Sequence, residues 1–152
     1  MNTSEAVKNE LKALLEMQKN LTALVRDKKD FIAFGTTYQH WYSRAYKLVE
    51  SLAPERLNEF ASYYLIDPKR KIIDADNYVL QDYIKCIGAR TDYDKNPLWD
   101  INNLAMIRIL NQLQILASLS SRIDSVLQDV TGHLFAELQD AELVAVPRNS
   151  KK

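Results

Sequence analysis

The longest hydrophobic pattern of the chain lies in its C-terminal third. Apolar residues recur there at alternating steps of three and four, the spacing of a helix that packs lengthwise against another helix. The positions in this register are Met106, Ile109, Leu113, Leu116, Ser120, Ile123, Leu127, Val130 and Leu134. Between Arg108 and Arg122, 13 residues carry no charge, which is not typical of a surface helix. The pattern predicts a long helix from about residue 98 to about 129, or as far as 144, that is either central in a bundle or part of a subunit interface.

The N-terminal segment carries a seam of the same kind. Thr3 or Ser4 can cap its helix, which is expected to continue to about Lys29. The apolar positions of this seam are Val7, Leu11, Leu14, Leu21 and Val25. Two long helices with such seams can pair along much of their length.

Prolines divide the first half of the chain into further, shorter helices. Asp30 is expected to cap or bend the chain before a helix that ends near Leu52. Pro54 suits the first turn of a third helix, because proline has no N–H and its φ is already helical, and Pro68 ends that helix. The residues expected to be buried by these two helices include Phe34, Tyr38, Trp41, Phe60 and Tyr64.

A fourth helix is expected to begin at Asp74 or Asp76. Gly88 is expected to end this helix in the left-handed conformation, because glycine adopts positive φ without steric cost. The segment 89–97 is polar and is expected to be a loop. The inward-facing residues of the fourth helix are then Val79, Leu80, Tyr83, Ile84 and Ile87.

Together these elements predict an all-α protein. We expect an elongated bundle of about five helices, in which the long first and last helices pack antiparallel and the shorter ones close over one side. Only three glycines and four prolines are present, too few for the turns of an all-β fold. Residues 1–146 are expected to form one helical domain, followed by a flexible tail at 147–152.

Composition gives no sign of a polyanionic partner, a disulfide or a membrane. Lys plus Arg and Asp plus Glu are both 20, so the formal net charge is zero. The single Cys86 excludes an internal disulfide and is expected to be a buried, inert thiol. The start, Met1 to Glu5, lacks the apolar core of a secretion signal, and no run reaches the roughly 18 apolar residues of a membrane-spanning helix. We therefore expect a cytoplasmic protein.

A metal site is conceivable on the last helix, but a solvent-facing stripe explains the same residues. Asp129, His133 and Glu137 are spaced four residues apart, so an unbroken helix would place them on one face, where they could bind a metal or move a proton. Three such residues on one helix, without a second cluster, more often form a solvated face with an ordinary ion pair. We expect no metal and no other cofactor.

Two groups of basic residues are candidate anion sites. His40, Arg44 and Lys47 form a stripe that could bind phosphate or simply face solvent. The run Lys69, Arg70 and Lys71 lies between pairs of tyrosines and could hold single-stranded nucleic acid by phosphate contacts and base stacking. The tyrosines are Tyr63, Tyr64, Tyr78 and Tyr83, and they are more often core residues. The aspartates Asp67, Asp74, Asp76 and Asp82 offset the local positive charge.

Four segments of the chain form a recognisable pattern, namely Tyr38–Ser43 (YQHWYS), Pro54–Phe60 (PERLNEF), Asp67–Lys71 (DPKRK) and Tyr78–Tyr83 (YVLQDY). Together they resemble an uncharacterised helical region of bacterial proteins that precedes a HEPN-type (higher eukaryotes and prokaryotes nucleotide-binding) domain. The resemblance covers roughly residues 31–141 and is a pattern of positions without a catalytic signature. It implies a bacterial or phage-related setting, such as defence, and a non-catalytic helical module attached to another part.

A ribonuclease activity does not follow from this resemblance. HEPN ribonucleases resemble one another in a motif of an arginine, four to six residues and a histidine, and neither His40 nor His133 has an arginine at that distance. The chain also lacks a glycine-rich phosphate loop, a Ser or Cys nucleophile motif and a paired-cysteine zinc pattern. We therefore expect no enzymatic activity.

The function predicted from these patterns is that of a helical module for protein–protein interaction or oligomerisation. It would form a homo-oligomer or bind an effector subunit, for example as an accessory subunit of a bacterial defence or regulatory system. The alternative is an accessory protein that binds RNA or single-stranded nucleic acid through Lys69, Arg70 and Lys71. The contact with a protein partner is expected on the last helix, at Ile109, Leu113, Leu116, Ala117, Ser120 and Ser121.

Overall fold

The computed structural model describes residues 3–27 and 30–125, and all its regular elements are helices. They are α1 Thr3–Asp27, α2 Phe31–Leu52, the 3₁₀ helix η1 Pro54–Arg56, α3 Leu57–Ser62, α4 Leu80–Ile84, α5 Ile101–Ser118 and the 3₁₀ helix η2 Leu119–Ser121. These residues contain no β-strand, only an isolated bridge between Thr91 and Pro97. The all-α class predicted from the sequence is confirmed. The predicted tail at 147–152 and the extension of the last helix past residue 125 lie outside the described residues.

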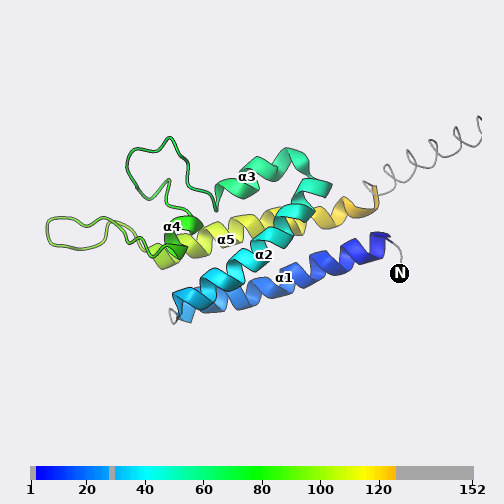
Figure 1. Cartoon of the computed structure of the whole chain (residues 1–152), viewed down its shortest axis with the longest axis horizontal. Helices are drawn as coiled ribbons and strands as arrows, with labels where there is room; N and C mark the ends of the chain where they lie inside the picture. The colour runs from blue at the N-terminus through cyan, green and yellow to red at the C-terminus, as the bar shows by residue number, and fades with distance from the viewer. Residues whose placement is uncertain (1–2, 28–29, 126–152) are drawn as a thin grey trace, which may run out of the picture.

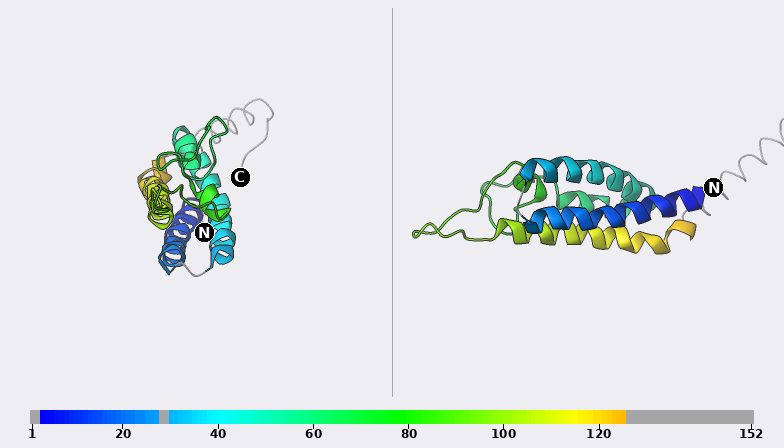
Figure 2. Two further views of the ribbon diagram at one scale, coloured as in Figure 1. Left: turned by 90° about the vertical axis from the view of Figure 1, so that its left-hand side faces the viewer. Right: turned by 90° about the horizontal axis from the view of Figure 1, so that it is seen from below.

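The three long helices α1, α2 and α5 lie side by side along the long axis of the molecule (Figures 1 and 2). The directions of α1 and α5 are opposite, as two hydrogen bonds show. Near one end of the pair, Ser4 Oγ donates to Asp124 Oδ1 at 2.6 Å. Near the other end, Asn102 Nδ2 donates to the carbonyl of Val25 at 3.3 Å. The short elements η1, α3 and α4 lie beside α2 and α5 and close the bundle on one side.

The core forms where the apolar seams of the long helices meet the aromatic face of α2. From α1, Leu14 and Leu21 are fully buried, and from α5 the same is true of Ile109 and Leu116. The aromatic residues that α2 adds include Phe34, Tyr38 and Trp41. Burying this much apolar surface is the main source of stability for such a bundle.

Two buried polar side chains of this core have partners, whereas Trp99 Nε1, which packs against the core, is buried without one. Trp41 Nε1 donates to the carbonyl of Leu14 at 2.9 Å, which joins α2 to α1. Gln112 of α5 accepts a hydrogen bond from the hydroxyl of Tyr38 at 2.7 Å and donates to the carbonyl of Phe60 at 3.0 Å. A buried amide without partners would cost roughly 1–3 kcal/mol, so these bonds fix how α5 is rotated against its neighbours.

Two helix starts are set by aspartate caps. The side chain of Asp30 accepts from the backbone N–H groups of Ile32 and Ala33, both at 3.0 Å, as the sequence predicted for the start of α2. Asp100 caps α5 in the same way, through Asn102 and Asn103. The last long helix therefore begins at Ile101, slightly later than the predicted start near residue 98.

The fourth helix is shorter than predicted and ends differently. It begins only at Leu80 and has five residues, because residues 63–79 form turns and loop instead of a helix from Asp74 or Asp76. The left-handed residue after it is Cys86, with φ 63°, and not Gly88. This turn also places Cys86 at the surface, so the prediction of a buried thiol was wrong.

Gly35 has a packing role that its place in the first turns of α2 does not reveal. A β-carbon at this position would lie 3.2 Å from Cγ2 of Ile84. The glycine therefore lets α4 approach the backbone of α2 closely.

The buried side of α5 has the expected helical spacing in a different register. Its row of buried positions advances by steps of four and three residues and consists of Ala105, Ile109, Gln112, Leu116, Leu119 and Ile123. Of the predicted seam, Met106 and Leu113 are only half-buried and Ser120 is exposed, so the prediction was wrong at these three positions. The difference begins in the first turns of α5 and continues through the 3₁₀ helix η2.

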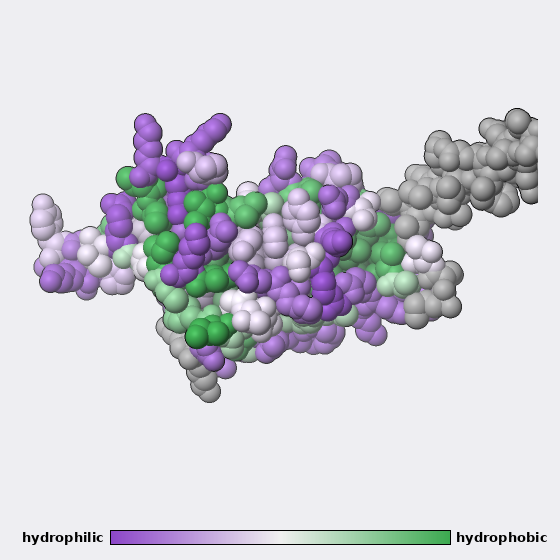
Figure 3. Space-filling view, viewed as in Figure 1, coloured by the Kyte–Doolittle hydropathy of each residue, from purple (hydrophilic) through white to green (hydrophobic). Residues whose placement is uncertain are grey.

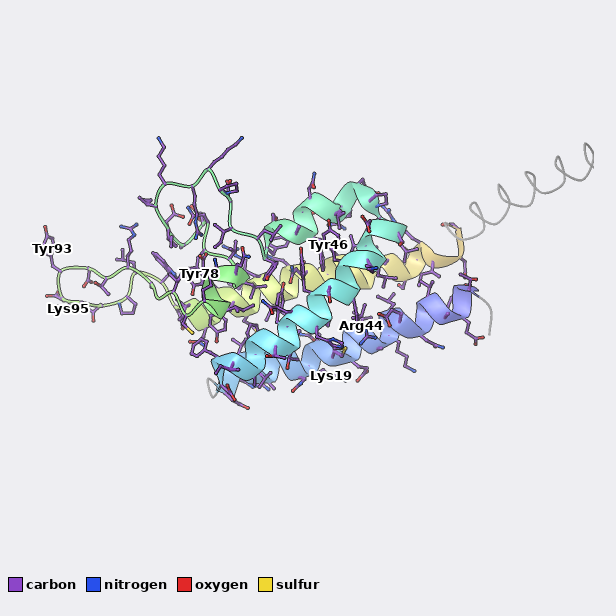
Figure 4. All side chains as sticks on the ribbon, viewed as in Figure 1. Lys19, Arg44, Tyr46, Tyr78, Tyr93 and Lys95 are labelled. Atoms are coloured by element: carbon purple, nitrogen blue, oxygen red, sulfur yellow. The ribbon has the colours of Figure 1, made fainter. Side chains whose placement is uncertain are left out.

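The loop between α4 and α5 projects beyond the end of the bundle (Figure 1). Asp92 organises its tip, where its side chain accepts from the N–H groups of Asp94 and Asn96, both at 2.9 Å. Tyr93 and Lys95 lie at the tip, and Tyr93 is fully exposed (Figure 4).

Candidate functional site

The basic run predicted as a nucleic-acid contact is divided by the structure. Both terminal nitrogens of Arg70 donate to the carboxylate of Asp82, at 2.5 and 2.8 Å, and one of them also donates to the carbonyl of Asn77 at 3.0 Å. Asp82 is fully buried, and its hydrogen bonds raise the pKa of Arg70. Arg70 therefore holds the loop before α4, and only Lys69 and Lys71 are exposed for an anion.

The stripe of His40, Arg44 and Lys47 is also not assembled into a phosphate site. Arg44 Nε and Nη2 donate to the two carboxylate oxygens of Glu10 on α1, at 2.9 and 2.6 Å. This bidentate bond lowers the pKa of Glu10 despite partial desolvation. Figure 4 shows Arg44 where α2 faces α1, so the guanidinium joins two helices, while His40 and Lys47 point to solvent.

Within residues 3–27 and 30–125, no group of three His, Cys, Asp or Glu residues is arranged to hold a metal ion. The candidate trio Asp129, His133 and Glu137 lies outside the described residues.

A hollow with a volume of about 540 Å³ lies between α3, the loop that follows it and α5. Arg108 lines it, but the guanidinium donates to the carbonyls of Tyr78 at 3.1 Å and Ala75 at 3.0 Å and is thereby held in place. The acidic residues of its lining, Asp67 and Asp76, are exposed. This arrangement stabilises the loop and brings no nucleophile and base together.

The outer side of α5 has a second seam, opposite the one that enters the core. Asn103, Ile107, Leu110, Gln114 and Ala117 follow one another at steps of four and three residues, and all are exposed. They fall within about 80° of the helix circumference. We call these five residues the outer face of α5. In the end view of Figure 2, α5 lies at an edge of the bundle.

The outer face is uncharged and partly apolar. Ile107 is 38% exposed and Leu110 is 42% exposed. The only charged residue of α5 is Arg108, which turns away to bind the carbonyls described above. By contrast, the side of the molecule in Figure 3 mixes hydrophilic and hydrophobic residues.

The predicted interface residues divide between the core and the surface. Ile109 and Leu116 are 0% exposed and belong to the core of the single chain, so a partner cannot reach them. Leu113 is half-buried, and the exposed members of the set are Ala117, Ser120 and Ser121. Both faces of an uncharged run look alike in sequence, which is why the inner seam was taken for the interface. The sequence did contain a signal for the exposed side of the helix, because Ile107, Leu110 and Gln114 follow one another at the same steps of three and four residues.

No known protein family, curated protein or solved structure matches the chain. The resemblance to the region preceding HEPN-type domains therefore stays a prediction. None of the helices in the described part of the chain is long and apolar enough to cross a bilayer.

Proposed function

We propose that this chain is a non-catalytic helical module that binds another protein through the outer face of α5. The observation that carries the proposal is the exposure of Ile107 and Leu110 on a face without charge. Charged side chains are depleted at the centres of protein interfaces, and contiguous exposed apolar surface often marks them.

The pairing of ionisable groups supports a role without catalysis. Arg70 is bound to Asp82, Arg44 to Glu10, and Arg108 to backbone carbonyls. A catalytic site needs a nucleophile, a base and a stabilising donor that converge on one space. In the described residues these groups instead join elements of the fold to one another.

The elongated bundle suits such a module. Antiparallel α1 and α5, with α2 beside them, form a scaffold that presents the outer face of α5 as a rigid helix. Rigid helices bind with less loss of conformational entropy than flexible segments. Together with the resemblance noted in the sequence, this favours an accessory subunit of a bacterial defence or regulatory system in the cytoplasm.

A photo-crosslinking residue at Leu110 tests the proposal. It is expected to form covalent adducts with a protein, because Leu110 lies on the outer face. The matched control is the same residue at Ile72, which is 59% exposed on a loop away from this face and should give no such adduct. Adducts of equal yield at both positions, or none at Leu110, would rule out the outer face as the binding surface.

A further inference from the structure

We propose that Tyr42 and Tyr64 form a site of oxidative modification, at which a small one-electron oxidant couples the two rings into a dityrosine. The new bond would join α2 to the turn that follows α3. This inference goes beyond the proposed function and does not depend on the outer face of α5. It rests on the distance between the two rings, on their access to water and on the different surroundings of a neighbouring tyrosine.

The rings of Tyr42 and Tyr64 are the closest pair of aromatic rings in the described part of the chain. Their centroids are 4.5 Å apart and their planes are inclined by 42°. Neighbouring rings hold them together, since Tyr42 stacks on Phe60 at 5.6 Å and Tyr64 packs against Tyr38 at 5.4 Å. In a dityrosine one carbon–carbon bond joins the ring carbons next to the hydroxyl-bearing ones, and the two rings have a similar separation and twist. The rings therefore need to slide past one another but not to be brought together.

The reaction balances with an oxidant that accepts single electrons, such as the carbonate radical anion, which is reduced to carbonate. Each ring gives one electron to the oxidant and its phenolic proton to water, which leaves a phenoxyl radical. The two radicals then form a carbon–carbon bond. The hydrogens on the joined carbons leave as protons while the oxygens take protons up, so both hydroxyls are restored. In total, two electrons and two protons leave the protein.

The surroundings of Tyr38 show why the radicals should form on Tyr42 and Tyr64. Tyr38 is fully buried, and its hydroxyl donates at 2.7 Å to the amide oxygen of Gln112, which is too weak a base to take a proton. Tyr42 and Tyr64 are half-buried, and within the described residues neither hydroxyl is enclosed without a partner, so water can accept their protons. Burial raises the pKa of Tyr42 to about 12, so its phenol is neutral at neutral pH and its oxidation requires this release.

Carbonate radicals generated in a dilute solution of the protein test the proposal. Peptide mapping by mass spectrometry, with fragmentation to locate the joined residues, should find Tyr42 coupled to Tyr64 with the loss of two hydrogens. The fluorescence of dityrosine should appear with this product. Tyr42→Phe and Tyr64→Phe should each lose both signals, because phenylalanine has no phenolic hydrogen. Tyr46→Phe is the matched control and should keep them, although the ring of Tyr46 lies 5.8 Å from that of Tyr42.

A fully exposed tyrosine separates coupling within the chain from collisions between chains. Tyr93 makes the second control, because the crosslink between Tyr42 and Tyr64 should persist in Tyr93→Phe and its yield per chain should not change with dilution. A product that joins other tyrosines in its place overturns the proposal, as do oxidised tyrosines without any joined pair. Crosslinking of Leu110 to another protein is unaffected by either result, so the proposed function stands or falls separately.

Discussion

At the scale of the residue, several charged side chains of this protein hold helices and loops together. Asp82 shows this most clearly, since it is fully buried and accepts hydrogen bonds from Arg70 and from the N–H group of Val79. Arg44 and Glu10 form a similar pair nearer the surface. Sequence alone placed Arg70 and Arg44 in candidate anion sites, because their spacing along the chain does not reveal an acidic partner 12 or 34 residues away.

The pair of Glu10 and Arg44 predicts a dependence of stability on pH. The bond from Arg44 lowers the pKa of Glu10 below its ordinary value of 4.5. A carboxyl with a lowered pKa stabilises the folded chain above its unfolded pKa, and this contribution disappears as the pH falls through the folded pKa. Glu10→Gln should therefore reduce the free energy of unfolding at pH 7 but not at a pH well below 4.5. The loss should be at most about 1 kcal/mol, because both side chains are partly exposed.

Urea unfolding of both proteins across this pH range measures the effect. The control is the same substitution in an Arg44→Met background, where the pH-dependent difference should vanish. A difference that persists without Arg44 would show that another group sets the pKa of Glu10.

At the scale of the element, α5 has two faces that are equally uncharged and differ in burial. The inner face carries Ile109 and Leu116, and the outer face carries Ile107 and Leu110. The caps at Asp30 and Asp100 show that a helix start depends on local sequence, since an aspartate binds N–H groups two and three residues ahead. Helix ends were less predictable, because the short α4 and the tightening at Leu119 depend on what packs against them.

The same substitution on the two faces of α5 should change the stability of the single chain by different amounts. Leu116→Ala is expected to cost about 2–5 kcal/mol of unfolding free energy, because Leu116 is 0% exposed and its loss leaves a cavity. Leu110→Ala should change the stability of the single chain by only about 0.5 kcal/mol, since Leu110 is 42% exposed. Denaturant titration at low protein concentration compares the two. Equal losses would mean that α5 is rotated differently from the structure described.

At the scale of the whole molecule, balanced charge and an elongated bundle favour a protein partner over a nucleic acid. The formal net charge is zero. Within the basic run, the guanidinium of Arg70 is occupied by its ion pair with Asp82. Nucleic-acid binding at physiological salt generally requires several cations placed along the phosphates. Lys69 and Lys71 alone provide too few.

We therefore expect no salt-sensitive binding of single-stranded RNA. Fluorescence anisotropy with a labelled oligonucleotide at low and moderate salt should give the same signal for the wild type and for Lys69→Gln combined with Lys71→Gln. Lys12→Gln combined with Lys47→Gln removes two exposed lysines elsewhere and serves as the matched control. An affinity that falls with salt and is lost only in the Lys69 and Lys71 variant would favour the nucleic-acid alternative.

The sequence by itself determined the all-α class, the approximate positions of the long helices and the apolar seam of α1. These depend on local capping and on a hydrophobic period that repeats along one chain. Only the tertiary structure decided which side of α5 is buried, so that Gln112 lies in the core and Leu110 is exposed. It also decided that Arg70 forms an ion pair with Asp82. The physical reason is that burial and pairing depend on neighbours distant in sequence. A 13-residue run without charge presents uncharged surface in every direction, and the packing of α1 and α2 against one side leaves the other side exposed.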